Sequence, residues 1–459
     1  MSLKNLPSVE IVTQSLEKQL NLPKSLITQF VRDSITAWRK QLLEKGGEVE
    51  KEDIVSDIRA KLEAFSLSRL QPVINATGVL IHTNLGRSPM GERSANALKQ
   101  IATGYSNLEF NLADGQRGKR AGYIETALAT LLGADAAIAV NNCAAALVLA
   151  LRYFTSGDKK EVIVSRGELV EIGGGFRIPE IMETSGATLV EVGATNKTHL
   201  KDYENAITEN TALILKVHRS NFYIEGFTDE PSIIDLRDLS KKHNLPLMQD
   251  IGSGAVMHTD ELAPIDHEPT PQRSLKDGIE LICFSGDKLL GGPQSGILAG
   301  RADFIAGIKK EPFFRAVRCD KLILTVLQEC IDSYLESISD KDTSNIPMLE
   351  FMRRSPESIR ARAESVVSSL EGIDADISIV DSIARTGGGT MPKAEIPSVA
   401  IRIAPKNISI NKLAKNLRLN HQIVGYTDNA ALCFDLRTLF EEQDQILAEA
   451  VRAELSSGF

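Results

Sequence analysis

A lysine and a carboxylate each follow a short apolar run, in the manner of residues at the ends of two buried strands. Lys288 comes directly after the run at 281–284, in a turn of small residues, and Asp250 ends the run that contains Met248. A lysine presented in this way can form a Schiff base with an aldehyde cofactor, and an acid can keep a pyridine nitrogen protonated so that the ring withdraws electrons. The pair therefore predicts a site for pyridoxal phosphate.

The neighbours of both residues bear on this prediction. Ser285 stands three residues before Lys288, and several glycines follow the lysine. The backbone around Lys288 is therefore crowded, and its amine is expected to be desolvated. Asp287 could steer protons or hold a substrate hydroxyl, or it could simply pair with an arginine. A solvated lysine at a strand end, and an Asp250 that binds a metal or caps a helix, are the plain alternatives.

A site for the cofactor phosphate is expected where the strand at 136–140 meets the helix at 144–153. Small side chains at this junction, including Cys143 and Ala144, leave backbone N–H groups of the helix N-terminus open to an anion. The glycines at 173–175 offer a competing phosphate site, although they lack the Gly-Lys-Ser/Thr ending of a P-loop.

Arginines could bind an anionic second substrate through bidentate hydrogen bonds. Arg315 and Arg318 are three residues apart and are predicted to share a helix face, and Arg87 lies among turn residues. His218, at the end of the strand at 212–217, could stack on or hydrogen-bond to the cofactor. A structural histidine and solvated arginines are the alternatives.

The chain is organised as three predicted domains. Residues 1–66 form three amphipathic helices with balanced charge, so this unit could bind RNA or serve as an oligomerisation arm. Residues 67–340 alternate strands and helices, which predicts a mostly parallel sheet with ligands at the carboxyl ends of its strands. A long helix is expected from Pro312 to Ser337, and residues 341–459 form a smaller α/β domain.

Composition limits the class of protein. The 459 residues carry a net charge of -9, which excludes a general affinity for polyanions but allows a local basic surface. The five cysteines are scattered, which favours reduced thiols. No segment has the length of a membrane span and the first residues lack the apolar run of a signal peptide, so we expect a cytoplasmic protein without membrane contact.

Several motifs together resemble one family, the bacterial L-seryl-tRNA(Sec) selenium transferases, or selenocysteine synthases, and the resemblance extends over essentially the whole chain. The lysine motif alone is typical of the wider fold-type-I, aspartate aminotransferase-like group of pyridoxal phosphate enzymes. The matching segments are Ile74-Asn75-Ala76-Thr77-Gly78-Val79, His82-Thr83-Asn84-Leu85-Gly86-Arg87-Ser88-Pro89, Tyr105-Ser106-Asn107-Leu108-Glu109-Phe110, Arg166-Gly167-Glu168-Leu169-Val170-Glu171-Ile172-Gly173-Gly174, Val217-His218-Arg219-Ser220-Asn221-Phe222, Ser285-Gly286-Asp287-Lys288-Leu289-Leu290-Gly291-Gly292-Pro293-Gln294 and Arg315-Ala316-Val317-Arg318.

The resemblance implies an activity and an assembly. The implied enzyme converts L-seryl-tRNA(Sec) to L-selenocysteinyl-tRNA(Sec) in two halves: loss of water leaves a dehydroalanyl group on the tRNA, and selenium from selenophosphate then adds. It also implies that Lys288 carries the cofactor, that Asp287 assists catalysis, and that the selenium donor is held by Arg87, Arg315 and Arg318. The N-terminal helices would grip the tRNA, and the subunits would form a decamer, a pentamer of dimers with active sites at the dimer interfaces.

Two rival functions remain at this stage. Related proteins with the same core act as lyases on small amino acids or sugar acids, and they typically lack the N-terminal helical unit. A catalytically idle tRNA-binding scaffold is the other rival, although a scaffold has no need of Lys288 beside Asp250. Only the enzymes require the coloured lysine-bound cofactor.

Overall fold

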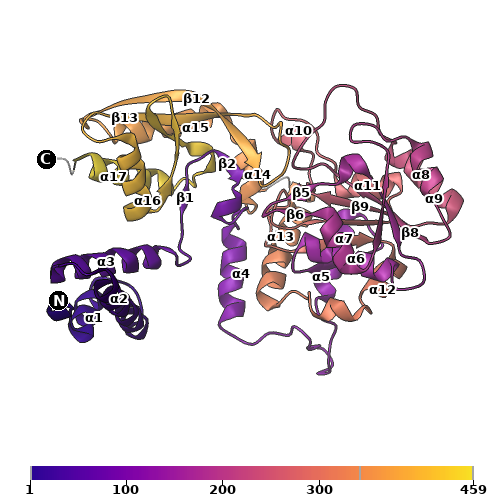
Figure 1. The fold of residues 1–459 in the computed structure, drawn as a ribbon. Helices are drawn as coiled ribbons and strands as arrows, with labels where there is room; N and C mark the ends of the chain where they lie inside the picture. The colour runs from indigo at the N-terminus through magenta and orange to yellow at the C-terminus, as the bar shows by residue number, and fades with distance from the viewer. Residues whose placement is uncertain (1–2, 341–342, 457–459) are drawn as a thin grey trace. The chain divides into compact units, whose positions relative to one another are not determined.

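The computed structural model describes residues 3–340 and 343–456, and the chain divides into two compact units (Figure 1). The first comprises Met1–Val73 with Lys415–Gln422, and the second comprises Ile74–Ala414 with Ile423–Phe459. Within the described residues, every helix is too short or too polar to cross a bilayer. The predicted domain boundaries at residues 66 and 340 stay predictions.

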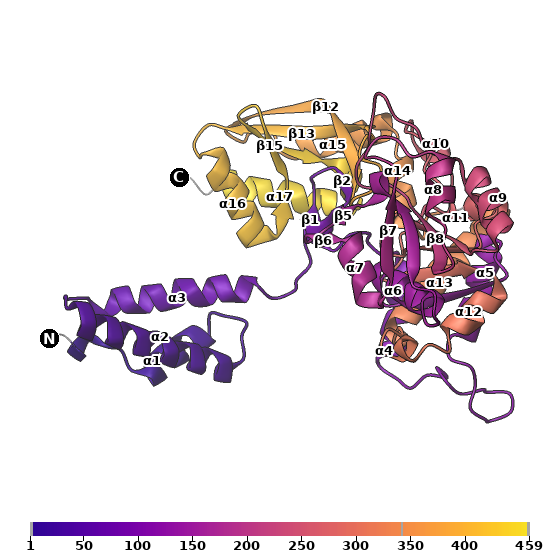
Figure 2. The ribbon, with the colours of Figure 1, turned by 45° about the vertical axis from the view of Figure 1, so that its right-hand side comes forward.

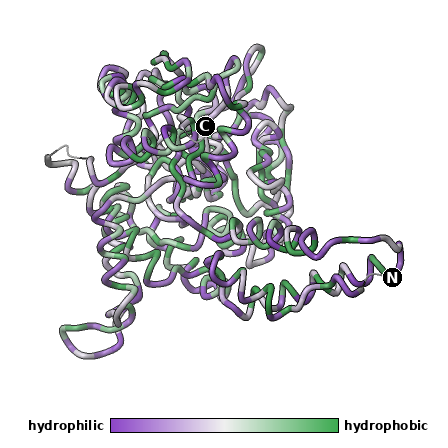
Figure 3. The backbone as a smooth tube through the Cα atoms, turned by 90° about the vertical axis from the view of Figure 1, so that its left-hand side faces the viewer, coloured by the Kyte–Doolittle hydropathy of each residue, from purple (hydrophilic) through white to green (hydrophobic). Residues whose placement is uncertain are grey.

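The N-terminal unit is built from three helices, α1 (Val9–Glu17), α2 (Lys24–Lys45) and α3 (Lys51–Leu67), preceded by the short η1 (Leu3–Asn5). Hydrophobic and hydrophilic residues alternate along these helices, as Figure 3 shows. One apolar face of each helix is buried in a shared core. The fully buried residues of this core are Leu16, Ile27, Val31, Ile54, Ile58 and Leu62.

A seven-stranded sheet forms the centre of the second unit, in the order β3-β11-β10-β9-β8-β4-β7 (Figure 2). All neighbouring pairs are parallel except those of β11, which runs antiparallel to both β10 and β3. The strands are β3 (Ala136–Val140), β4 (Glu161–Ser165), β7 (Thr188–Val192), β8 (Thr211–Val217), β9 (Leu247–Gly252), β10 (Leu281–Ser285) and β11 (Gly296–Gly300).

Successive residues of a strand point to opposite faces of the sheet, and both faces of this sheet are buried. Ile163 packs in one hydrophobic cluster, while Val162 and Val164 pack in another. Helices α5 (Gly122–Leu132), α9 (Ile233–His243) and α13 (Lys321–Asp340) contribute to the first cluster. The second cluster contains residues of α6 (Cys143–Phe154), α7 (Ile178–Ser185) and α12 (Ala302–Ile308). Four further helices complete this part, α4 (Glu92–Ala102), α8 (Leu200–Ala206), α10 (Thr259–Leu262) and α11 (Pro271–Asp277).

A second sheet carries the C-terminal part of the chain, in the order β15-β16-β13-β12-β2. Its strands are β2 (Val79–Ile81), β12 (Ala375–Gly387), β13 (Ile396–Pro405), β15 (Tyr426–Asp428) and β16 (Ala431–Asp435). The helices of this part are α14 (Pro347–Arg353), α15 (Pro356–Ser368), α16 (Ile410–His421) and α17 (Gln443–Ser456). The short β1 (Ile74–Asn75) pairs with β14 (Ile423–Val424).

The strands and helices predicted around the site are confirmed, but the continuous helix from Pro312 to Ser337 is wrong. The segment begins with a short helix, η4 (Pro312–Arg315), and α13 begins only at Lys321. Asp320 caps α13, since its Oδ1 accepts hydrogen bonds from the backbone of Leu322 and Ile323 at 2.8 and 3.0 Å. This aspartate is an N-cap signal that divides the segment.

Candidate active site

A cavity of about 1180 Å³ lies at the carboxyl ends of the parallel strands. Strand β8 delivers His218 to it, β9 delivers Asp250, and β10 delivers Ser285 and then Lys288. Eight of the ten predicted site residues line this one cavity, namely Arg87, Cys143, Ala144, His218, Asp250, Ser285, Asp287 and Lys288.

Asp250 is a buried carboxylate with a side chain only 8% exposed. Burial raises the pKa of this carboxyl above its usual value, and the nearby positive charge of Lys288 opposes the rise. Among the residues that the structure describes, no lysine, arginine or histidine nitrogen lies within 4.0 Å of the carboxylate. The site therefore holds a buried acid that lacks a close cationic partner, and a protonated pyridine nitrogen would supply one.

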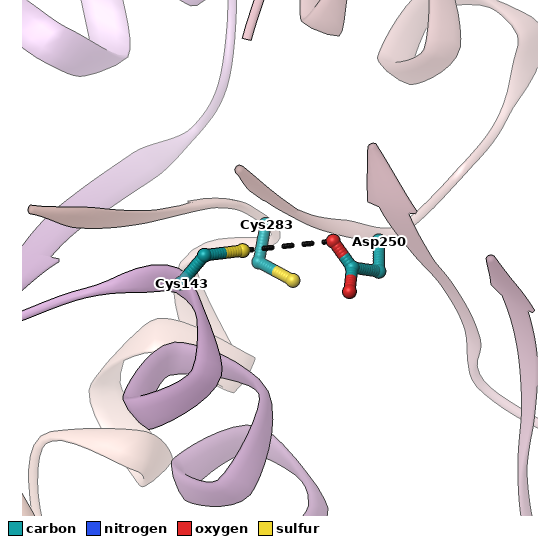
Figure 4. Close-up of side chains that lie close together, drawn as sticks. All are labelled: Cys143, Asp250 and Cys283. Carbon is teal, nitrogen blue, oxygen red and sulfur yellow. Dashed lines mark hydrogen bonds between the residues drawn. The ribbon is translucent and has the colours of Figure 1, made fainter. Parts of the chain in front are cut away.

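Two thiols lie beside Asp250, both on the same side of its carboxylate (Figure 4). Cys143 Sγ lies 3.6 Å from Asp250 Oδ1, and Cys283 is the register partner of Asp250 on the neighbouring strand. The three possible ligand atoms lie within 4.8 Å of one another, as a metal site would require. However, the hydrogen bond with Cys143 and then burial raise the pKa of the Cys283 thiol, so without a metal the arrangement favours a protonated Cys283 beside the carboxylate.

The turn that carries Lys288 is fixed through its backbone. The N–H of Leu289 donates to the carbonyl oxygen of Ser253 at 3.0 Å, and the Ser88 hydroxyl donates to the carbonyl oxygen of Lys288 at 2.7 Å. Gly286 allows close packing here, because a Cβ at this position would lie 2.1 Å from Ser295 Oγ. The lysine side chain is thus presented to the cavity from a rigid backbone.

Arg87 and Asp287 form an ion pair at the cavity wall. Arg87 Nη1 lies 2.9 Å from both Oδ1 and Oδ2 of Asp287, and the aspartate is 5% exposed. Arg87 adopts a left-handed backbone conformation, with φ of 67°. The sequence left open whether Asp287 steers protons or holds a substrate hydroxyl, or instead pairs with an arginine. The structure shows Asp287 paired with an arginine.

His218 is oriented by a residue that sequence reasoning missed. Its Nε2 lies 2.9 Å from Glu268 Oε1, and its backbone N–H donates to the carbonyl oxygen of Asp250 at 2.8 Å. Glu268 is buried, at 6% exposure, and comes from the loop before α11. An acidic residue among prolines, in His-Glu-Pro-Thr-Pro, was the only local sign of it.

The N-terminus of α6 opens into the same cavity. Asn142 caps this helix by accepting a hydrogen bond from the Ala145 N–H at 2.8 Å, while the first two N–H groups, those of Cys143 and Ala144, have no place in the helical ladder. Strand β11 passes close by at Gly296. The glycines at 173–175 line the cavity as well, so both predicted phosphate sites border it.

Arg315 and Arg318 do not line this cavity. The shared helix face predicted for them is wrong, because Arg315 ends η4 and Arg318 lies beyond it, in an isolated bridge with Val140. Arg315 is exposed, and Arg318 Nη1 lies 3.6 Å from Glu109 Oε1. Within one chain the two residues are apart from Lys288.

Comparison with known proteins decides the family. The family model described as L-seryl-tRNA selenium transferase matches residues 73–440. The chain belongs to this family. The L-seryl-tRNA(Sec) selenium transferase of Carboxydothermus hydrogenoformans is 42% identical over 450 residues, with 96% of this chain and 95% of the relative covered. The protein of the same name from Aquifex aeolicus is 40% identical, with 99% of each chain covered.

A solved structure supports the fold of this selenium transferase family member. The structure of D-glucosaminate-6-phosphate ammonia-lyase matches with a TM-score of 0.58 and 18% identity, covering 85% of this chain and 97% of that one. The core is a fold-type-I α/β core with a mostly parallel sheet, as the sequence predicted. The chain is therefore a transferase whose family and fold both imply pyridoxal phosphate.

Proposed function

We propose that this chain converts L-seryl-tRNA(Sec) to L-selenocysteinyl-tRNA(Sec) with selenophosphate as the selenium donor. The carrying observation is that Lys288 and the buried Asp250 face one cavity at the strand ends. In the overall reaction the serine C–O bond breaks and its hydroxyl leaves as water, the selenium forms a C–Se bond, and the P–Se bond of the donor is hydrolysed by water to give phosphate. Relatives over almost the whole length carry the name of this activity.

The cavity fits pyridoxal phosphate. When bound, this cofactor withdraws electrons from the substrate carbon that loses its proton. Lys288 Nζ would hold the cofactor aldehyde, Asp250 would balance the charge of the pyridine nitrogen, and the free N–H groups at the start of α6 would bind the phosphate. His218, held by Glu268, lines the same cavity and would contact the ring.

The remaining residues of the cavity suit the chemistry of the substrates. Lys288 Nζ is the base available to move the proton of the seryl α-carbon, since it is the lysine that lines the cavity. Arg87 uses one guanidinium nitrogen for both bonds to Asp287, and its other nitrogens can bind an anionic donor. The seryl carboxyl is esterified to RNA, so an arginine for a free carboxylate is not needed.

Arg315 and Arg318 are proposed to act in the site of a neighbouring subunit of a homodecamer, built as a pentamer of dimers. Arg315→Ala should then leave tRNA binding intact and weaken the use of selenophosphate. Mixing Arg315→Ala subunits with Lys288→Ala subunits tests this placement. Random mixing should restore about a quarter of the native activity, because half of the dimers are hybrids with one native site of two. Inactive mixtures would place Arg315 in its own subunit's site, and full activity of the Arg315→Ala protein alone would place it outside catalysis.

The N-terminal helices are proposed to bind the tRNA. The whole chain has a net charge of -9, so its affinity for RNA must come from a local surface. We propose that the reaction takes place in the cytoplasm, because its substrate is a tRNA and tRNAs are used there.

Binding of seryl-tRNA(Sec) and of ordinary seryl-tRNA(Ser), at one stated salt concentration, tests the function. The visible absorbance of the protein is recorded in the same titration. Selective binding of seryl-tRNA(Sec) with a change in this absorbance is expected. A coloured protein without tRNA preference would indicate a lyase of small molecules, and a colourless protein that binds tRNA would indicate a scaffold.

A further inference from the structure

Three potential metal ligands meet in the segment between β9 and α11, which contains the short α10, outside the cavity of the active site. The side chains of His258, Asp260 and His267 are exposed, and their ligand atoms all lie within 4.8 Å of one another. The Nδ1 atoms of His258 and His267 are 3.4 Å apart, and His267 Nδ1 is 2.9 Å from Asp260 Oδ1.

The distance between the two Nδ1 atoms resembles an edge of a metal coordination tetrahedron, whereas the 2.9 Å contact of His267 with Asp260 is a hydrogen-bond distance that would lengthen slightly around an ion. With Zn–N bonds of about 2.0–2.1 Å, two nitrogens on one tetrahedral ion are separated by roughly 3.3–3.4 Å. The separation of the two Nδ1 atoms agrees with that value. Imidazole nitrogens and a carboxylate oxygen are also a donor set that zinc accepts. Without an ion, His267 Nδ1 contacts both His258 Nδ1 and Asp260 Oδ1.

We propose that His258, Asp260 and His267 bind one divalent transition-metal ion of the zinc class, with water completing its coordination. The two histidine ligands are nine positions apart in sequence, so the ion links the two ends of a short stretch of chain. It has a structural role, because none of its three ligands lines the active-site cavity.

The loop that the ion closes also carries Glu268. Thr259 Oγ1 donates to the carbonyl oxygen of Asp266 at 2.7 Å and accepts from the backbone N–H of Glu268 at 2.9 Å. Glu268 in turn contacts His218 in the active site. The metal would therefore stabilise the loop conformation that holds His218 in place, without touching any substrate.

Metal binding is tested on untagged, full-length protein loaded with pyridoxal phosphate. After treatment with a chelator, Zn²⁺ is titrated by calorimetry, and Co²⁺ serves as a spectroscopic probe of the ligands. We expect one equivalent of Zn²⁺, and a Co²⁺ spectrum of nitrogen and oxygen ligands without thiolate absorption. A thiolate-to-cobalt band would place the ion at Cys143 and Cys283 instead and overturn the proposal.

Variants locate the bound ion. His267→Ala and the conservative Asp260→Asn should each remove the stoichiometric binding, and Zn²⁺ should raise the unfolding temperature of the native protein but not of these variants. His199→Ala is the matched control, because His199 Nδ1 lies 3.2 Å from Asp229 Oδ2 in an exposed pair without a third ligand in the described chain. Retained binding in both Asp260→Asn and His267→Ala, or its loss in His199→Ala, would contradict the proposed site.

Discussion

Arg87 and Asp287 are 200 positions apart in sequence, and Arg87 Nη1 donates to both carboxylate oxygens of Asp287 at 2.9 Å. The contact holds the turn after η2 (Thr83–Leu85) against the turn that carries Lys288. The neighbouring bond from the Ser88 hydroxyl to the Lys288 carbonyl oxygen strengthens the same junction. The position of Lys288 thus depends on a segment distant in sequence.

Replacing Arg87 tests this junction. Arg87→Ala leaves a buried carboxylate without its partner, so the free energy of unfolding should fall by about 1–3 kcal/mol, measured by denaturant titration. Arg87 is also proposed to donate charged hydrogen bonds to selenophosphate. Their loss should raise the KM for this donor about 10–100-fold. Arg273→Ala is the control, since Arg273 pairs with Asp277 on an exposed helix surface and should cost at most about 1 kcal/mol. Equal losses in both variants would remove the special role of Arg87.

Asp250 makes the stability of the cofactor-free protein depend on pH. Burial raises the pKa of Asp250 above its usual value of 3.8, so the folded state binds a proton more tightly than the unfolded state. As the pH rises from 3.8 through the raised pKa, the unfolded chain ionises first and the folded protein loses stability relative to an Asp250→Asn variant. Unfolding of both proteins across this range provides the measurement. Identical pH profiles would contradict a raised pKa.

Asp250→Asn has a second consequence for the cofactor-loaded protein. The native carboxylate can balance a cation on the pyridine nitrogen, whereas the amide cannot. The variant should retain the covalent bond to Lys288 while its turnover falls by several orders of magnitude, as expected when proton abstraction loses its electron sink.

Gly296 leaves room for the start of α6, where we propose that the cofactor phosphate binds. A Cβ at this position would lie 2.1 Å from the carbonyl oxygen of Asn142 and 2.8 Å from the backbone nitrogen of Cys143. Gly296→Ala should therefore displace the helix start, weaken the binding of pyridoxal phosphate and cost about 1–3 kcal/mol of stability. Equilibrium dialysis of the cofactor measures the effect. Gly157→Ala is the matched control, because a Cβ there meets nothing within 4 Å, and unchanged cofactor affinity in Gly296→Ala would refute the assignment of α6.

The strand ends could be predicted from sequence because each combines an apolar run with a chemically reactive residue. This local pattern located Lys288, Asp250 and His218, and the structure places all three at one cavity. An arginine partner was one of the options for Asp287, but Arg87 was not identified as that arginine, since no local pattern encodes a contact across 200 positions. Glu268 was missed for the same reason.

The arginines show where periodicity misleads. A spacing of three residues suggests one helix face, but the chain leaves the helical conformation after Arg315, and Asp320 begins a new helix. The antiparallel strand β11 also escaped prediction, because its residues Gly296–Gly300 are fully buried and lack an alternating pattern.

The N-terminal unit provides a test of tRNA binding that is separate from chemistry. Its buried core is its own, which supports removal of residues 1–66 as an experiment. The truncated protein should keep its visible absorbance and lose affinity for seryl-tRNA(Sec) in a filter-binding assay. Ile58→Ala is a milder variant, which should destabilise this unit by about 2–5 kcal/mol because Ile58 is fully buried. Unchanged tRNA affinity of the truncated protein would assign this unit a structural role.

The most direct test of the central claim is to identify the lysine that binds the cofactor. The protein loaded with pyridoxal phosphate is reduced with borohydride, digested, and analysed by mass spectrometry. The account predicts that the cofactor is fixed to Lys288 and that Lys288→Ala abolishes both the label and the turnover of seryl-tRNA(Sec). A label on another lysine, such as Lys216, which pairs with Glu168 at 2.8 Å, or an active Lys288→Ala variant, would contradict it.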